Sequence, residues 1–366
     1  MKPVRILVDS LADANLPNAQ ITNAREIIRR LDPDRFHVGV FCAGEPDPQV
    51  GRRPNTKIIP LPRRRRTLTI LREFVFGSHE ILFYMKAAPA GLMYARMRRF
   101  WKRGKVTVGT IESQSNLDRE PTIRKATINL WEQTILRCDY LFSNSVAVKQ
   151  NLEREYGLPS EIVPTGVDTK VFAPCPSRKA NSRPQVLFVG SLRPFKQPQL
   201  LLDSAVRYPY ADFVLAGEGL LLEELRGCAA RDGLANVYLL GGQTANELRD
   251  LYQRADIFLF PSEWEGSPKV ILEAAASGLP VIARNNYRPE TVIDGVTGYL
   301  VGTDSELYLR LEQLLLDPDL RRRLGVAGRK HSEHFDWDVI ARQWEDIFLH
   351  IGPSKVRPNK NSGRPS

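Results

Sequence analysis

The chain has 366 residues, of which 42% are hydrophobic, and its formal net charge is +10. This length suits two domains of ordinary size, and no apolar run approaches the ~20 residues that cross a membrane. The four cysteines lie far apart and form no CxxC pair, which argues against a disulfide framework or a zinc site and favours a cytoplasmic protein.

Short apolar runs rich in β-branched residues alternate with helical patterns along almost the whole chain. Strands that alternate with helices form parallel sheets covered by helices on both faces. The sequence therefore predicts an α/β fold with two doubly wound Rossmann-like domains facing each other across a cleft. The predicted strands are residues 4–9, 37–43, 56–61, 80–85, 105–111, 139–145, 184–190, 212–217, 237–242, 256–262, 279–283 and 298–301. The predicted helices are residues 23–31, 90–101, 122–137, 198–207, 220–232, 245–255 and 268–277.

A segment rich in Pro, Ser and basic residues near 173–184 predicts a linker between the two series. We assign residues 1–175 to an acceptor-side domain and residues 176–336 to a nucleotide-sugar-binding domain. The amphipathic helix over about 337–351 is a candidate to pack back on the first domain. Residues 352–366 are polar and basic, which predicts a disordered tail. Because ligands of such sheets lie outside the carboxyl ends of the strands, we expect the site in the cleft.

Basic residues gather in two segments. One is the run Arg63–Arg66, and the other, over residues 96–105, interleaves basic residues with Phe100 and Trp101. One interpretation is a solvated face that keeps the protein soluble. A second is a surface that rests on an anionic membrane. Nucleic-acid binding is disfavoured, because no RNA-binding signature is visible.

The stretch EWEGSPKVILEAAASGLPVI, residues 263–282, places Glu273 inside an otherwise apolar helix. A buried carboxylate is costly unless a protein group or a ligand hydrogen-bonds to it. Ser267 suits the N-cap position and Pro268 the first helical position. Free backbone N–H groups at Lys269 and Val270 would then form an anion site at the carboxyl end of a strand.

A second carboxylate, Glu265, lies in the loop before this helix. One carboxylate near a phosphate-binding helix start and another further inside suit the hydroxyl groups of a phosphorylated, polyhydroxylated ligand. A nucleotide sugar is such a ligand.

Several motifs occur in a fixed order: FVGSLRPFKQPQLLLDS, LAGEG, VYLLGGQTANELRDLYQRADIFLFPS, EGSPKVILEAAASGLPVI and VIDGVTGYLV. In this order they resemble glycosyltransferase family 4, densely over about 160–301 and thinly before that. The resemblance implies the GT-B architecture and a retaining, metal-independent enzyme that uses a nucleotide-sugar donor and no cofactor.

The resemblance also implies roles for individual residues. Glu273 matches the second glutamate of the E-x₇-E motif, which in the family holds the hydroxyl groups of the donor ribose. Glu265 matches the first glutamate, which lies close to the donor sugar. Lys196 matches the lysine that neutralises the diphosphate. A cation there lowers the barrier, because the leaving group gains negative charge. The predicted catalytic residues are Lys196, Glu265 and Arg193; the predicted donor-binding residues are Glu273, Gly266, Ser267, Pro268, Lys269, Val270, Gly190, Gly217, Glu218, Asn18 and Glu112.

The chain departs from the family at three places. Ser191 stands where the family often has an arginine, so Arg193 is either its substitute or a surface residue. The segment after the first strand lacks the usual Gly-Gly loop, and Asn18 with its helix entry could supply donors instead. Glu112 stands where a histidine is common, and either accepts from a sugar hydroxyl or caps the next turn.

These features predict a glycosyltransferase that moves a sugar to a hydroxyl of a glycan, lipid-linked or small-molecule acceptor. The expected location is the cytoplasm, either free or at the inner face of the membrane. Two alternatives stay open. One is a nucleotide-sugar epimerase of the same fold, and the other is a degenerate nucleotide-sugar-binding or nucleic-acid-binding protein.

Overall fold

A computed structural model describes residues 2–14, 18–98, 105–112, 129–177 and 180–352 of the chain. Several predictions lie wholly or partly outside these ranges, including the end of the helix predicted over 90–101 and the middle of the linker near 173–184. The others are the disordered tail beyond Gly352, the aromatic residues Phe100 and Trp101 of the second basic segment, and most of the helix predicted over 122–137.

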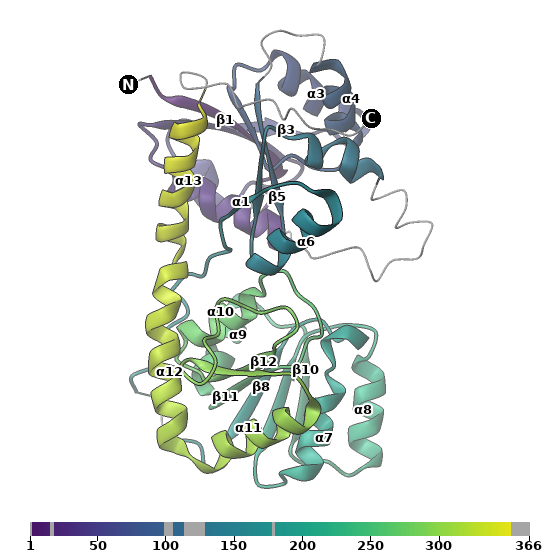
Figure 1. Cartoon of the computed structure of the whole chain (residues 1–366), viewed down its shortest axis with the longest axis vertical. Coiled ribbons are helices and arrows are strands. Elements are labelled where there is room, and N and C mark those ends of the chain that lie inside the picture. The colour runs from purple at the N-terminus through teal and green to yellow at the C-terminus, as the bar shows by residue number, and fades with distance from the viewer. Residues whose placement is uncertain (1, 15–17, 99–104, 113–128, 178–179, 353–366) are drawn as a thin grey trace. The chain divides into compact units, whose positions relative to one another are not determined.

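The chain divides into two compact units (Figure 1). Unit 1 comprises Met1–Asn144, Val148–Pro164 and Asp338–Ser366, and unit 2 comprises Ser145–Ala147 and Thr165–Trp337. Each unit is built around its own parallel sheet.

The sheet of unit 1 has seven strands in the order β3-β2-β1-β4-β5-β6-β7, and every pair in it is parallel. Its strand order reverses between β1 and β4, which are neighbours although two strands and their helices separate them in the chain. The elements are β1 (Val4–Leu11), α1 (Ala19–Arg30), β2 (Phe36–Cys42), α2 (Pro48–Arg52), β3 (Thr56–Pro60), the 3₁₀ helix η1 (Arg63–Arg65), α3 (Arg66–Phe76), β4 (Ile81–Phe83), α4 (Pro89–Met97), β5 (Val106–Ile111), η3 (Ile135–Arg137), β6 (Tyr140–Ser143), α6 (Val146–Tyr156) and β7 (Glu161–Ile162).

The sheet of unit 2 has six parallel strands in the order β10-β9-β8-β11-β12-β13, with the reversal between β8 and β11. Its elements are β8 (Gln185–Val189), η4 (Pro194–Lys196), α7 (Gln199–Arg207), β9 (Asp212–Ala216), α8 (Leu222–Arg231), β10 (Val237–Gly241), α9 (Ala245–Arg254), β11 (Ile257–Phe260), α10 (Lys269–Ala276), β12 (Val281–Arg284), β13 (Gly298–Val301), α11 (Asp304–Leu316), α12 (Pro318–Ser332) and η5 (Glu333–Phe335). The prediction of two parallel-stranded α/β sheets is confirmed.

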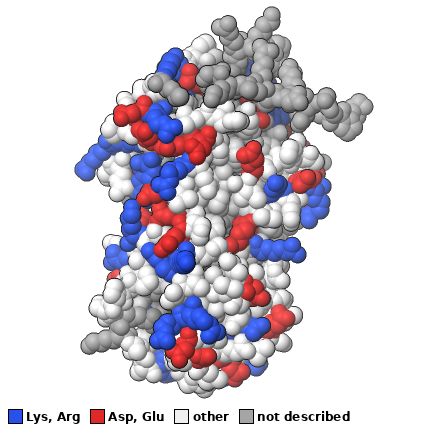
Figure 2. Space-filling view, turned by 60° about the vertical axis from the view of Figure 1, so that its left-hand side comes forward, with Lys and Arg blue, Asp and Glu red and all other residues white. Residues whose placement is uncertain are grey.

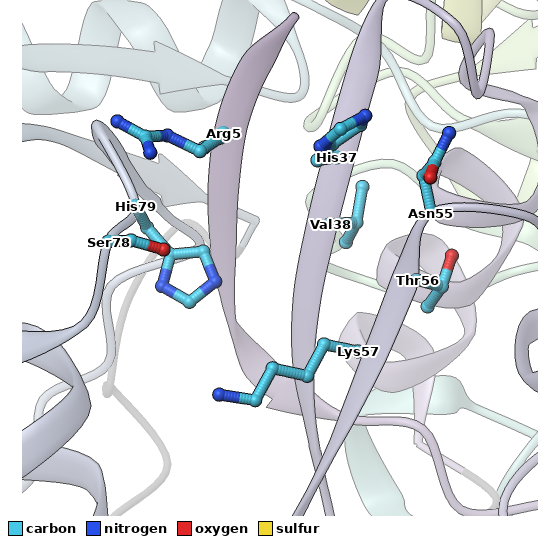
Figure 3. Close-up of a pocket in the computed structure, with 8 residues that line it drawn as sticks. All are labelled: Arg5, His37, Val38, Asn55, Thr56, Lys57, Ser78 and His79. Carbon is cyan, nitrogen blue, oxygen red and sulfur yellow. The ribbon is translucent and has the colours of Figure 1, made fainter.

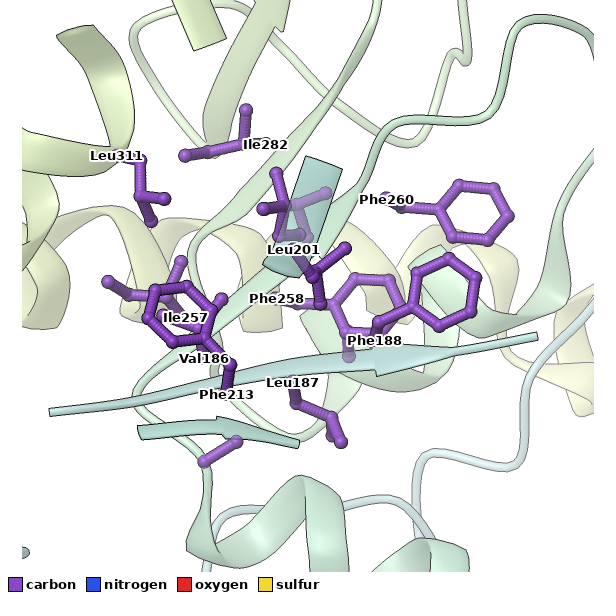
Figure 4. Packing of buried hydrophobic residues seen from close by; sticks show 14 of the residues in the cluster. Val186, Leu187, Phe188, Leu201, Phe213, Ile257, Phe258, Phe260, Ile282 and Leu311 are labelled. Carbon is purple, nitrogen blue, oxygen red and sulfur yellow. The ribbon is translucent and has the colours of Figure 1, made fainter. Parts of the chain in front are cut away.

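The central strands of unit 2 are apolar along their whole length, because helices cover both faces of a doubly wound sheet. All four residues of β11 and four of the five residues of β8 are buried. Figure 4 shows their side chains packed with Leu201 of α7 and Leu311 of α11. This core holds the strand ends, and therefore the loops that follow them, in fixed places within the unit.

The last helix, α13 (Trp337–Ile351), contributes the rings of Trp344 and Phe348 to the core of unit 1. The ring of Phe83 at the end of β4 lies 4.6 Å from that of Trp344 and 4.9 Å from that of Phe348. Phe36 in β2 also meets Phe348, at 6.2 Å.

No helix in the described part of the chain is both long enough and apolar enough to span a bilayer. Figure 2 shows one face of the protein, on which Lys and Arg side chains lie among Asp and Glu side chains. On this face the positive net charge is therefore not gathered into one continuous basic area.

Candidate functional site

The reversal between β8 and β11 in unit 2 is the point at which ligands bind open parallel sheets, outside the carboxyl ends of the strands. Lys196 ends η4, just after β8, and Glu265 lies in the loop that follows β11. The ammonium of Lys196 forms an ion pair with Oε1 of Glu265, and the Ser262 hydroxyl donates to the same oxygen at 2.7 Å. The structure thus brings together two predicted catalytic residues that are far apart in the chain.

Aromatic rings fix the position of the Lys196 ammonium. Its Nζ lies 4.8 Å from the ring centroid of Phe260 and 5.3 Å from that of Phe195. A cation over a ring face is attracted by the electrons of the ring. The charge is therefore held on two sides, by the rings and by Glu265. It lies at the switch point of unit 2, the place where the strand order reverses between β8 and β11.

Glu273 is the carboxylate that the sequence singles out. It is half-buried, and a protein group satisfies one of its oxygens. The Tyr252 hydroxyl on α9 donates to Oε2 of Glu273 at 2.9 Å. Burial raises the pKa of Glu273, while the hydrogen bond from Tyr252 and the charge of Lys269 oppose the rise. Oε1 has no protein partner among the described residues, yet it is not among the fully buried unpartnered atoms. It remains open to a hydrogen-bond donor.

The helix that carries Glu273 begins one residue later than predicted. Pro268, rather than Ser267, occupies the N-cap position of α10, and Lys269 is its first residue. Proline has no side-chain acceptor, so no side chain caps this helix. Three other predicted donor-binding residues are half-buried. They are Gly266 and Ser267, which follow Glu265 directly, and Val270 in the first turn of α10.

Two predicted glycines lie where the backbones after β8 and β9 meet. Gly217 has a φ of +150°, and a Cβ there would lie 1.9 Å from the carbonyl oxygen of Gly190. Only glycine fits such an approach. The carbonyl of Glu218 accepts from the Leu192 N–H at 2.8 Å, and the Glu218 side chain is exposed.

Arg193 occupies the N-cap position of η4 with its side chain exposed. Among the described residues no hydrogen bond or ion pair of its guanidinium is found. It lies three residues before Lys196, on the same loop.

Arg284, at the end of β12, is a site residue that the sequence prediction missed. Its guanidinium donates to Gln197 Oε1 at 2.9 Å and to the Pro261 carbonyl at 3.4 Å, and pairs with Asp304. It therefore ties the loop that carries Lys196 to the end of β11. An arginine directly after the apolar run of β12 was the available signal.

The reversal between β1 and β4 in unit 1 gathers a second set of polar residues. Asp9 near the end of β1 is buried and accepts from the Lys86 backbone N–H at 3.0 Å. Burial raises the pKa of Asp9 to about 6, although the charges of Lys86 and Arg66 oppose the rise. Tyr84, directly after β4, has a φ of 62°, which is rare for a tyrosine.

The two site residues predicted in unit 1 contact other residues of that unit. Asn18 is the N-cap of α1, and its Oδ1 accepts from the Gln20 N–H at 2.9 Å. Glu112 accepts from the Asn23 amide at 3.0 Å and from the Tyr84 hydroxyl. Glu112 thereby links the end of β5 to α1 and to the strained residue after β4.

We predict that Asp9→Asn changes the pH dependence of stability. The folded-state pKa of Asp9 is raised from 3.8 to about 6, so folding favours its neutral form. Its contribution to stability is present below pH 3.8 and is lost as the pH rises through about 6. At ~1.4 kcal/mol for each pKa unit, the loss is roughly 3 kcal/mol. Chemical denaturation should show the variant gaining stability over the wild type between acidic and neutral pH; a constant difference would contradict this.

In the described part of the chain no three His, Cys, Asp or Glu side chains are grouped as they would be to hold a metal ion. The switch-point residues of unit 2 instead offer fixed cations, a carboxylate oxygen and backbone donors. This set suits a ligand with phosphates and hydroxyl groups.

Comparison with known proteins matches both halves of the chain. Residues 174–331 match the model of glycosyl transferases group 1, and residues 22–171 match that of glycosyltransferase family 4. The chain is 31% identical over 324 residues to a GDP-mannose-dependent alpha-(1-6)-phosphatidylinositol monomannoside mannosyltransferase of Mycolicibacterium smegmatis, which covers 81% of each protein. It is 33% identical over 246 residues to a D-inositol 3-phosphate glycosyltransferase of Streptomyces bingchenggensis. That match covers 59% of this chain and only 54% of the relative.

Solved structures share the fold at low identity. Sucrose-phosphate synthase from Thermosynechococcus elongatus superposes with a TM-score of 0.77 at 20% identity, over 95% of this chain and 98% of that one. Anabaena HepE in complex with UDP-glucose superposes with a TM-score of 0.74 at 18% identity, over 94% and 99%.

Proposed function

Since the chain belongs to glycosyltransferase family 4 and is a nucleotide-sugar-dependent glycosyltransferase, we propose that its acceptor is a phosphorylated compound of the inositol type. We also propose that the sugar is transferred with retention of its anomeric configuration and without a metal ion. The observation that carries the proposal is the pairing of Lys196 with Glu265 at the switch point of unit 2, together with the open oxygen of Glu273 on the helix that follows. Retention and metal independence rest on the resemblance of the motifs to those of the family.

In the proposed donor complex, Glu273 Oε1 accepts from a ribose hydroxyl while Tyr252 holds Oε2. An ionised carboxylate that has one donor can still accept from a second, and hydrogen bonds to charged groups are stronger than those between neutral groups. Lys196 turns toward the diphosphate, with Glu265 between it and the sugar. The phosphates approach main-chain N–H groups in two places. One is the backbone of residues 266–269, and the other is the loop where Gly190 and Gly217 lie close together.

The proposed transfer occurs on one face of the sugar. The bond from the anomeric carbon to the diphosphate oxygen breaks, the acceptor oxygen bonds to that carbon from the same side, and its proton passes to the departing phosphate oxygen. Lys196 stabilises the negative charge that grows on the diphosphate. No protein nucleophile is needed for this sequence.

The acceptor class is inferred from chemistry in unit 1 together with the relatives. Both relatives are named for acceptors that contain a phosphorylated inositol. Asp9 lies close enough to Lys86 and Arg66 for their charges to oppose the rise in its pKa that burial causes. Arg66 is the first residue of α3 and the last of the basic run Arg63–Arg66, whose side chains are all exposed. The switch point of unit 1 thus has cations that suit an anionic acceptor.

Product analysis tests the proposed function. The full chain is incubated in EDTA with GDP-mannose or UDP-glucose and with either myo-inositol phosphate or vesicles that contain phosphatidylinositol. Proton NMR of the product should show an α linkage, as in the donor. Release of nucleotide only in the absence of acceptor, a β linkage, or strict dependence on added metal would contradict the proposal.

We predict that Arg65→Ala with Arg66→Ala raises the KM for the phosphorylated acceptor about tenfold, while the KM for the donor stays unchanged. A lost phosphate contact weakens binding by about 1–2 kcal/mol. The matched control changes Arg322 and Arg323 on α12, which are also adjacent and exposed. An equal effect of both pairs, or an effect on the donor KM, would show that the basic run does not recognise the acceptor.

A further inference from the structure

Unit 1 contains a pocket of about 330 Å³ that the proposed transfer does not use. It lies at the amino ends of the strands, whereas Asp9 and Glu112 lie at their carboxyl ends. Seven of its eight lining residues carry polar side chains, and four of them are basic (Figure 3). The lining residues are Arg5, His37, Val38, Asn55, Thr56, Lys57, Ser78 and His79.

Strand register explains why basic side chains converge there. Arg5 of β1 pairs with His37 of β2, and Gly39 of β2 pairs with Lys57 of β3. Residues paired across parallel strands, and residues two apart in one strand, point to the same face of a sheet. Three neighbouring strands therefore direct Arg5, His37 and Lys57 to one face.

Gly39 makes room on that face. A Cβ at Gly39 would lie 2.4 Å from Nε2 of His79, so the imidazole ring lies directly over this glycine. Figure 3 shows the Lys57 side chain extending from β3 toward the side on which His79 lies. A larger residue in place of Gly39 would push the ring out of the pocket.

Two of the lining residues have a buried nitrogen atom without a hydrogen-bond partner in the described part of the chain. Among the described residues, Nε of Arg5 and Nδ1 of His79 are buried and have no hydrogen-bond partner. His79 is 9% exposed. Unsatisfied buried polar atoms are rare in folded proteins and call for a ligand, an ion or a water molecule.

The electrostatic balance at His79 favours an anion. Burial and the charges of Lys105, Lys57 and Arg5 lower the pKa of His79 to about 4, against the opposing charge of Glu73. Glu80 pairs with Arg5 at 3.3 Å, and the carbonyls of Glu73 and Gly77 accept from Lys105. The ammonium of Lys57, which is exposed, has no ion-pair partner among the described residues.

We propose that this pocket binds a small phosphate monoester or inorganic phosphate, with Lys57 and His79 as its principal donors and Arg5 and His37 supporting them. A volume of about 330 Å³ is at the lower end of the range of small-molecule sites, which suits a ligand of this size. The site is independent of the sugar transfer, because none of its residues lies at either switch point.

Histidine NMR on the full chain tests this site directly. The chain has five histidines, of which two line the pocket. Long-range proton–nitrogen spectra of histidine-labelled protein are recorded while inorganic phosphate is added, and His37→Gln and His79→Gln assign the signals. We expect saturable shifts of His37 and His79 while the signals of His331, His334 and His350 stay in place.

Matched variants and salts make the result decisive. Lys57→Ala should weaken phosphate binding at least about tenfold, a loss of ~1.4 kcal/mol, whereas Lys149→Ala on α6 should not. Lys196→Ala should leave the His79 shift intact, which separates this site from the donor site. Bound sulfate should raise the pKa of His79 above about 4, because a nearby anion favours the imidazolium. Equal shifts with potassium chloride, unsaturable shifts, or unchanged binding in Lys57→Ala would overturn the proposal.

Discussion

Lys196→Ala should lower kcat by about 10²–10³ while the fold stays intact, since removing one preorganised group that stabilises transition-state charge has an effect of this size. The ammonium of Lys196 is held by Glu265 and by the rings of Phe260 and Phe195. No other described cation of unit 2 is fixed in this way at the carboxyl end of β8. Steady-state kinetics with a saturating donor measure the effect.

The controls separate lost catalysis from lost structure. Lys196→Ala leaves the carboxylate of Glu265 without its cation, which alone could disturb the loop. Lys196→Met combined with Glu265→Gln removes both charges and should be equally inactive but well folded. Lys330→Ala, an exposed lysine on α12, should keep wild-type turnover. Turnover of Lys196→Ala within a few-fold of the wild type would refute its assignment.

Glu273→Gln should weaken donor binding by about 10- to 100-fold and at the same time stabilise the fold at neutral pH. Burial raises the pKa of Glu273, so folding favours its neutral form, and the folded state loses stability as the pH rises above the usual carboxyl range. Glutamine keeps an acceptor for Tyr252 and removes that charge. The loss of donor affinity follows from replacing a charged acceptor by a neutral one. Titration calorimetry and chemical denaturation measure the two effects.

Tyr252→Phe provides the complementary comparison. Its hydroxyl donates to Glu273 Oε2 and holds the pKa of that carboxyl down. Removing the hydroxyl should therefore destabilise the protein more at neutral than at acidic pH, opposite to Glu273→Gln. The exposed Glu224→Gln on α8 should change neither stability nor affinity. If Glu273→Gln lost stability at neutral pH, the carboxylate would be a structural anchor rather than a donor ligand.

The fold could be predicted from sequence because each central strand is a short apolar run between helical patterns. The predicted helices do not include α2, α3, α6, α11 or α12, and the predicted strands do not include β7. Strand β7 has two residues, both exposed, and so has no apolar run. Helix α3 begins within the arginine run, which was interpreted as a surface segment.

The candidate donor site was partly predictable, because its carboxylates follow one strand within a single motif. The hydrogen bond from Tyr252 to Glu273 was not, since nothing in the sequence of α9 shows which tyrosine faces α10. The contact of Asp9 with Lys86 and that of Tyr84 with Glu112 depend on the strand order, which places β1 beside β4 and β4 beside β5. The basic pocket depends on register across β1, β2 and β3. Neither register nor strand order can be read from local patterns.

The most direct measurement is calorimetric titration of GDP and of UDP in EDTA into the wild type, Lys196→Ala and Glu273→Gln. The central claim is that a nucleoside diphosphate binds at the carboxyl end of β8 and β11. It predicts that at least one nucleotide binds the wild type at one site, and that both variants bind it at least about tenfold more weakly, a loss of ~1.4 kcal/mol. Wild-type affinity in both variants, or no binding of either nucleotide to the wild type, would contradict it.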